Sequence, residues 1–181
     1  MAGSIIPDKK QWPRVFFAFK HNDPLLRLTQ LIRDRLDRDR VWAYRLVDDP
    51  HPGTNLRERA TRAIQTTDGL VLFWSQQARE SAWVRSEYDS ARIAGKPVCL
   101  VRFPGVTQPT NWNPDVEWVD LDGVLFARPN IPRLPVISLA TALTGPVRTL
   151  EPAFGNMVRK VGIFARDSAR TRLGSQGIRF R

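Results

Sequence analysis

The stretch GLVLFWSQQARESAWVRSEYDSARIAGKPVCLVRF, which runs from Gly69 to Phe103, decides the fold. It opens and closes with continuous apolar runs, residues 70–74 and 98–101, whose length and composition are typical of strands buried on both faces. One helix is predicted between them. A strand, helix and strand of this size form a right-handed crossover, which places the first turn of the helix at the carboxyl end of the first strand. Open α/β sheets bind their ligands at that edge.

Ser81 is the expected N-cap of this helix, and Gly95 is expected to end it. Trp83 and Glu87 are four residues apart and therefore share one face of the helix. We expect this face to differ from the apolar stripe that packs on the sheet. For an arbitrary helical Glu the ordinary interpretation is a solvated carboxylate. The apolar stripe consists of Val84, Tyr88 and Ala91.

The chain before this stretch repeats the same alternation of strand and helix. Apolar runs predict strands over residues 14–19 and 41–46. Asp23 and Asn55 are expected to begin the two helices that follow these strands. After the central stretch, residues 116–121 supply a fifth strand. The order predicts an α/β fold with a flavodoxin-like, doubly wound, five-stranded parallel sheet.

The composition is that of a globular protein. The chain has 181 residues, an apolar content of 42% and six Trp, which is enough for one domain with a real core. Its single cysteine, Cys99, is expected in the core, and neither of its two histidines has a Cys or His partner at metal-ligand spacing. We find no secretory leader and no membrane span, which predicts a soluble, cytoplasmic protein without membrane partners.

The predicted organisation is a lead over residues 1–13, a domain over 14–122 and a C-terminal extension over 123–181. The extension is expected to be partly helical, over residues 139–143 and 153–165, with a frayed basic end from Ala169. Its last 34 residues hold eight Lys or Arg against two acids. An apolar stripe at helical spacing predicts that the extension docks on the domain and serves assembly or binding of a protein partner. This stripe consists of Phe154, Met157, Val158 and Val161.

Four boxes of this sequence, in this order, resemble the Toll/interleukin-1 receptor (TIR) domain family, of the bacterial NAD+-consuming type, over about residues 14–119. The strongest is the apolar strand ending LFWS, followed by SAWVRSE and GKPV. The first strand, VFFAF, resembles the family's first box, with Phe19 where Tyr is usual and Ala18 in place of a Ser. The loop from Asp48 to Thr54, with Gly53, resembles the BB loop of the family.

The resemblance implies two different functions. Some TIR domains only assemble, whereas others cleave NAD+ at the nicotinamide glycosidic bond, and in these enzymes a glutamate at the position of Glu87 is essential. NAD+ is then a substrate, and no cofactor is implied. We expect Glu87 to be catalytic and Phe19, Lys20, Gly53 and Trp83 to bind substrate. The ordinary alternatives are that Phe19 lies in the core, that Lys20 is a solvated cation and that Trp83 only packs against the sheet.

The leading hypothesis is an NAD+ glycohydrolase or ADP-ribosyl cyclase of bacterial antiviral defence or cell death. Its activity would depend on homo-oligomers formed through TIR–TIR contacts that include the loop from Asp48 to Thr54. A non-enzymatic TIR scaffold is the first alternative, and a nucleoside 2-deoxyribosyltransferase-like enzyme is the second. Nucleic-acid binding by the basic tail is disfavoured, because no recognition motif accompanies the charge. The sequence does not predict which product forms, what triggers activity or how an oligomer is arranged.

Overall fold

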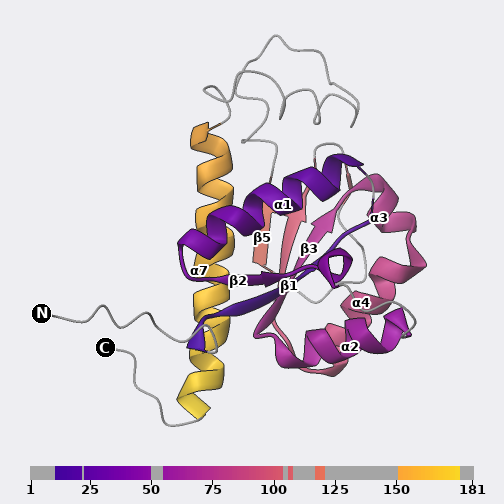
Figure 1. Cartoon of the computed structure of the whole chain (residues 1–181). Coiled ribbons are helices and arrows are strands. Elements are labelled where there is room, and N and C mark those ends of the chain that lie inside the picture. The colour runs from indigo at the N-terminus through magenta and orange to yellow at the C-terminus, as the bar shows by residue number, and fades with distance from the viewer. Residues whose placement is uncertain are drawn as a thin grey trace, which may run out of the picture.

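The computed structural model describes residues 11–21, 23–49, 55–103, 106–107, 117–120 and 151–175. Five strands form one parallel sheet in the order β2-β1-β3-β4-β5, which confirms the predicted doubly wound fold (Figure 1). The strands are β1 (Arg14–Ala18), β2 (Trp42–Tyr44), β3 (Gly69–Trp74), β4 (Val98–Arg102) and β5 (Glu117–Asp120). The helices are α1 (Asp23–Arg38), α2 (Leu56–Thr66), α3 (Gln76–Glu80), α4 (Ala82–Ile93) and α7 (Glu151–Ser175), with a 3₁₀ turn, η2 (Leu46–Asp48).

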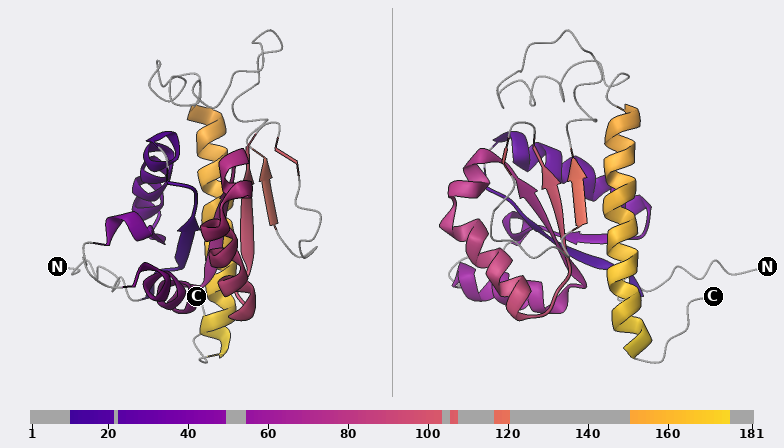
Figure 2. Two further views of the ribbon diagram at one scale, coloured as in Figure 1. Left: turned by 90° about the vertical axis from the view of Figure 1, so that its right-hand side faces the viewer. Right: turned by 180° about the vertical axis from the view of Figure 1, so that it is seen from behind.

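The central strand β3 explains why this part of the sequence reads as a continuous apolar run. All six of its residues are buried, and it pairs with β1 on one side and β4 on the other. Helices cover both faces of the sheet. One face carries α1 and α7, which contact each other, and the other carries α2 and α4, which also contact each other (Figure 2). Crossovers that run in opposite directions from the middle of the sheet place their helices on opposite faces. A strand in this position has no solvent-facing side and therefore shows no alternation.

The connection between β3 and β4 contains two helices, not the single predicted one. The hydroxyl of Ser75 accepts a hydrogen bond from the backbone N–H of Ala78 and begins α3. Ser81 then caps α4 as predicted, by accepting from the N–H of Val84. With only five residues, α3 is too short for an apolar periodicity to reveal it. The left-handed backbone of Gly95 (φ 63°) follows the end of α4.

The helix α7 is longer and more deeply packed than the sequence predicts. It runs unbroken from Glu151 to Ser175, so the end expected to fray from Ala169 is helical for two more turns, and Ala169 itself is fully buried. The docking of its apolar stripe on the domain is confirmed, since Met157, Val158 and Val161 belong to the same core as the sheet. The other predicted helix of the extension, residues 139–143, lies outside the described residues.

The packing of α7 on β3 is close enough to require a glycine. A Cβ on Gly69 would lie 2.9 Å from Cζ of Phe164 and 3.1 Å from Oγ of Ser168. Beside this contact the buried carboxylate of Asp68 forms an ion pair with Arg172 of α7. The boundary at residue 122 remains a prediction, but the helix beyond it completes the core of the domain. Within the described ranges, no helix is long and apolar enough to cross a membrane.

Candidate functional site

A pocket of about 470 Å³ opens at the carboxyl end of the sheet, where β1 and β2 end and α4 begins. This is the edge at which doubly wound sheets bind ligands. Three of the four residues expected to bind substrate line it: Phe19, Lys20 and Trp83. The remaining lining residues are His21, Leu46, Val47, Asp49, Leu56 and Ser81. Gly53, the fourth expected residue, lies outside the described residues, as do residues 50–54 of the BB-like loop.

Phe19 belongs both to the core and to the pocket, so its two interpretations are not exclusive. Only 1% of Phe19 is exposed, and its ring meets Phe73 edge-on with 6.3 Å between the ring centroids. On another side the ring of His21 lies 5.0 Å away. The guanidinium of Arg45 stands 5.9 Å from the centroid of the Phe19 ring. The ring is therefore held in place by its neighbours and forms a fixed wall of the pocket.

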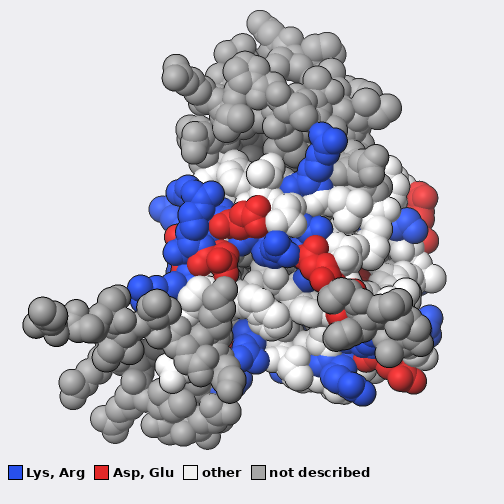
Figure 3. All heavy atoms as spheres, in the orientation of Figure 1, with Lys and Arg blue, Asp and Glu red and all other residues white. Residues whose placement is uncertain are grey.

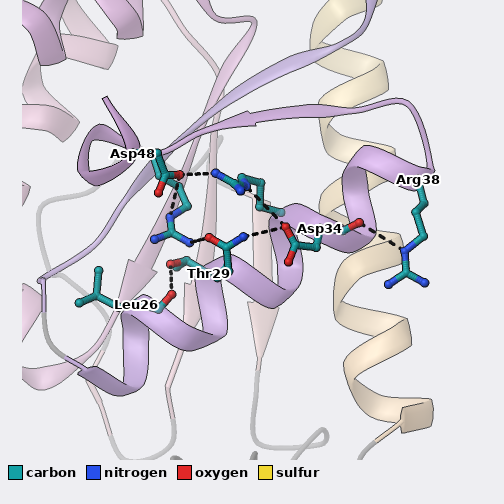
Figure 4. Close-up of polar contacts among 8 residues, drawn as sticks. Leu26, Thr29, Asp34, Arg38 and Asp48 are labelled. Carbon is teal, nitrogen blue, oxygen red and sulfur yellow. Dashed lines mark hydrogen bonds and ion pairs between the residues drawn. The ribbon is translucent and has the colours of Figure 1, made fainter. Parts of the chain in front are cut away.

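Arg45 also belongs to a polar network that joins the η2 turn to α1 (Figure 4). Arg45 is 5% exposed, donates a hydrogen bond to Oε1 of Gln30 on α1 at 2.6 Å and lies 3.3 Å from the carboxylate of Asp48. Arg33 of α1 forms a second ion pair with Asp48. Burial lowers the pKa of Arg45, and the charge of Asp48 opposes this shift. The network ties the η2 turn and the pocket wall to α1.

His21 also lines the pocket, although it was not among the residues expected to bind substrate. Burial lowers the pKa of His21, and the positive charges of Lys20 and Arg45 lower it further. These causes all favour the neutral imidazole at pH 7. Its position was the available signal, because His21 is the third residue after the end of β1, next to Phe19 and Lys20. Within the part of the chain that the structure describes, no group of three His, Cys, Asp or Glu is arranged to hold a metal.

Glu87 is buried, which corrects two expectations. It is 4% exposed, so it is not a solvated carboxylate, and it lies on the buried face of α4 together with Val84 and Tyr88. Nε1 of Trp83 donates a hydrogen bond to Oε1 of Glu87 at 2.9 Å. The other oxygen, Oε2, has no hydrogen-bond partner among the described residues. Burial raises the pKa of Glu87 to about 8, although the hydrogen bond from Trp83 lowers it.

Trp83 connects the Glu87 carboxyl group to the pocket. Its side chain borders the large pocket, and it also borders a hollow of about 10 Å³ that Glu87 lines with residues of α2, including Arg57 and Thr61. Glu87 itself does not line the large pocket in this structure. The structure therefore brings Phe19, Lys20 and Trp83 together around one pocket and places Glu87 one hydrogen bond beyond it.

Comparison with solved structures finds proteins that are similar to this chain. The chain is similar in structure to a 2-deoxyribosyltransferase of the psychrotolerant bacterium Bacillus psychrosaccharolyticus, with 13% identity, a TM-score of 0.47, and coverage of 59% of this chain and 85% of that chain. It is also similar to the TIR domains of the activated Roq1 resistosome that recognises the pathogen effector XopQ, with 14% identity, a TM-score of 0.45, and coverage of 90% and 98%. No curated protein matches the chain.

The family assignment rests on the sequence. The model of the TIR-domain family matches residues 15–130, which is more than half of the chain. This range includes the five strands except the first residue of β1, all residues that line the large pocket, and the Trp83–Glu87 pair. The match confirms the resemblance predicted from the four sequence boxes, and the chain belongs to the TIR-domain family.

Proposed function

We propose that this TIR domain cleaves NAD+ at the nicotinamide glycosidic bond, with Glu87 as the catalytic carboxylate. The observation that carries the proposal is a buried carboxyl group next to the pocket, held by Trp83 on one oxygen and left without a described partner on the other. Burying a carboxyl group without a full set of hydrogen-bond partners is costly, and it is not expected of a glutamate that only covers the surface of a helix. Buried carboxyl groups with strongly shifted pKa values cluster at functional sites.

The chemistry requires one carboxylate and no general acid. Nicotinamide leaves as a neutral molecule from a cationic ring, so the leaving group needs no proton. The ribose becomes an oxocarbenium ion as the bond breaks, and a carboxylate can stabilise or capture this cation. The raised pKa keeps Glu87 protonated in the empty protein near pH 7. A cationic substrate close to Glu87 favours its ionised form, so binding itself promotes loss of the proton.

The other pocket residues have proposed roles that follow from their chemistry. Phe19 and Trp83 would provide flat apolar walls for the rings of NAD+, and Lys20, which lines the same pocket, would pair with its diphosphate. Because Glu87 lines only the small hollow, the side chain of Trp83 has to turn aside for the carboxylate to reach the ribose. We therefore expect substrate binding to change the rotamer of Trp83.

The identity of the product depends on which nucleophile reaches the ribose first. Attack by water gives linear ADP-ribose, whereas attack by the adenine of the same molecule gives a cyclic isomer. A cyclic product of this kind is a signal that suits a role in bacterial antiviral defence or cell death, which the family resemblance suggests. Chromatography of the products formed from NAD+ distinguishes these outcomes.

The test is nicotinamide release by the purified protein and by matched glutamate variants. Glu87→Gln keeps the side-chain volume and removes the charge, so we expect the rate to fall about 10²-fold or more. Glu80→Gln is the control, because Glu80 is exposed on the neighbouring helix α3 and bonds only to Gln76 among the described residues. If the Glu87→Gln variant releases nicotinamide at the parental rate, the catalytic assignment is wrong.

A non-enzymatic scaffold is the second candidate, and exposed apolar residues favour it. Val47 is 38% exposed and Leu56 is 52% exposed, on either side of the BB-like loop. Apolar side chains in such a position can pack against another copy of the domain. Assembly and catalysis are compatible with each other. If the protein forms oligomers that depend on Val47 and Leu56 but releases no nicotinamide, the scaffold hypothesis is preferred.

A further inference from the structure

A second pocket, of about 330 Å³, lies between the edge strand β2 and helix α2. Trp42 and Tyr44 line it from the strand, and Arg59 and Arg62 line it from the helix. It is distinct from the larger pocket, whose border includes neither the two arginines nor Trp42. Asp49 alone borders both pockets. The volume is at the lower end of the range for pockets that bind small molecules.

The strand side of this pocket offers an aromatic surface. Trp42 is 38% exposed, although it is the kind of residue that usually becomes buried. Its ring is fixed by two neighbours: the ring of Tyr44 packs edge-on at 5.9 Å between centroids, and the guanidinium of Arg14 lies 5.6 Å from the centroid of the indole. A large ring that is both accessible and held in one orientation is suited to stack on a planar ligand.

The helix side of the pocket is basic. Arg59 donates to the carboxylate of Asp49 at 3.1 Å and to its backbone carbonyl at 3.1 Å, and the hydroxyl of Tyr44 donates to the same carboxylate at 2.9 Å. Arg59 and Asp49 therefore offset each other's charge. Arg62 lies three residues further along the same face of α2, is exposed, and has no ion-pair partner within the described ranges. One positive charge thus remains available to a ligand.

We propose that this second pocket binds a phosphorylated aromatic ligand of the size of a nucleoside monophosphate. The planar base stacks on Trp42, and the phosphate pairs with Arg62. A guanidinium matches the geometry of a phosphate group and binds it with charge-assisted hydrogen bonds. We expect tight binding to require both the base and the phosphate, because the pocket offers one stacking surface and one available cation. Basic and acidic side chains are interleaved over the face of the molecule that Figure 3 shows. In the pocket itself Asp49 stands beside the two arginines, so a small anion fits it better than a long polyanion.

The test is calorimetric titration of the full chain with adenosine monophosphate as the probe. We expect saturable binding that Arg62→Glu weakens about tenfold or more, because the substitution removes the phosphate contact and adds repulsion. Trp42→Ala should weaken binding by a similar factor through loss of stacking. Arg35→Ala is the control, since Arg35 is an exposed arginine on α1 away from either pocket. The melting temperatures of all variants verify that each one is folded.

Binding at the larger pocket is excluded by a second variant. Binding of adenosine monophosphate in the larger pocket would depend on Lys20, whereas the binding that Arg62→Glu removes should persist in Lys20→Ala, because Lys20 lines only the larger pocket. The proposal is overturned if adenosine monophosphate does not bind at millimolar concentrations, or if Lys20→Ala weakens binding while Arg62→Glu does not. Adenosine or inorganic phosphate that binds as tightly as the monophosphate also overturns it. None of these results depends on whether the protein cleaves NAD+.

Discussion

Nε1 of Trp83 and Oε1 of Glu87 are joined by a 2.9 Å hydrogen bond between two residues that lie one turn apart on α4. This bond opposes the effect of burial on the carboxyl group: burial favours the neutral acid, and a donor aimed at the carboxylate favours the anion. The balance leaves the pKa of Glu87 at about 8, so a modest change in surroundings decides its charge at neutral pH. The protonation of Glu87 is therefore accessible to experiment.

The stability of the protein should depend on pH through Glu87. The pKa of its carboxyl group is raised in the folded protein, from the ordinary value of 4.5 to about 8, so this group favours folding most at low pH. As pH rises from about 4.5 to 8, the unfolded chain has lost the proton that the folded protein still holds, and stability falls by about 1.4 kcal/mol per pH unit. Above pH 8 both states are ionised and the loss levels off.

The Glu87→Gln variant isolates this contribution. Its free energy of unfolding lacks the carboxyl titration, so the difference between parent and variant should shift in favour of the variant by several kcal/mol between pH 5 and pH 9. Denaturant unfolding at several pH values measures it. This expectation differs from that for a solvated Glu87, whose replacement is worth only about half a kcal/mol at any pH. A difference that does not vary with pH would show that Glu87 is ionised throughout.

Removing the indole donor should move the pH dependence of activity. Rates that require the carboxylate rise with pH, so kcat/KM for NAD+ should increase through about pH 8, the pKa of Glu87 in the free protein. Trp83→Phe keeps an aromatic wall but removes the hydrogen bond that lowers this pKa. We expect its profile to shift to higher pH. Trp42→Phe, on the edge strand, should keep the parental profile, and an unshifted profile in Trp83→Phe contradicts the role given to the bond.

Arg45 should control the charge of His21. Its positive charge is one of the causes that lower the pKa of His21, after burial and Lys20. Arg45→Met should therefore raise that pKa towards its ordinary value, which NMR titration of the histidine resonances measures. Asp48 keeps its ion pair with Arg33 in this variant, so no buried carboxylate is left unpaired.

Arg38→Met is the control for this measurement. Arg38 donates only to the backbone oxygen of Asp34 within the described residues, on the exposed side of α1. The Arg38→Met substitution should therefore leave the pKa of His21 unchanged. A His51→Gln variant assigns the two histidine resonances. If the pKa of His21 is the same in Arg45→Met as in the parent, the guanidinium does not act on the imidazole.

The sheet was predictable from local patterns, because β3 and the first four residues of β4 are apolar, and Ser81 and Gly95 mark the ends of α4. The position of Glu87 on a helix at the ligand edge was also predictable. The burial of Glu87 was not predictable, because it results from α2 packing over α4. In the sequence, the whole of β3 lies between these two helices. Protonation depends on that long-range contact, and a sequence pattern carries no measure of it.

The remaining parts of the site depend on contacts between distant residues. The guanidinium of Arg45 over the ring of Phe19 joins residues that follow two different strands, β2 and β1, and nothing in either local sequence indicates the pairing. The second pocket likewise combines Trp42 of β2 with Arg62 of α2. For Gly69, the residue itself is seen in the sequence at the start of the central stretch, but the reason for a glycine is not. Only the close packing of α7 against this position shows why a side chain does not fit there.

Gly69→Ala should destabilise the packing of α7 on the sheet. The new Cβ would lie 2.9 Å from Cζ and 3.0 Å from Cε1 of Phe164, closer than carbon atoms approach without movement. Either the Phe164 ring or the helix must shift, and overpacking of this kind typically costs about 1–3 kcal/mol. Gly155→Ala is the matched control within α7: a Cβ there meets nothing within 4 Å, so the substitution should be neutral or stabilise the helix by roughly 0.5–1 kcal/mol. Denaturant unfolding of both variants measures these effects. Phe164→Leu in the Gly69→Ala background should recover part of the loss by making room for the methyl group. A Gly69→Ala variant as stable as the parent would mean that α7 does not pack against β3 as closely as the structure shows.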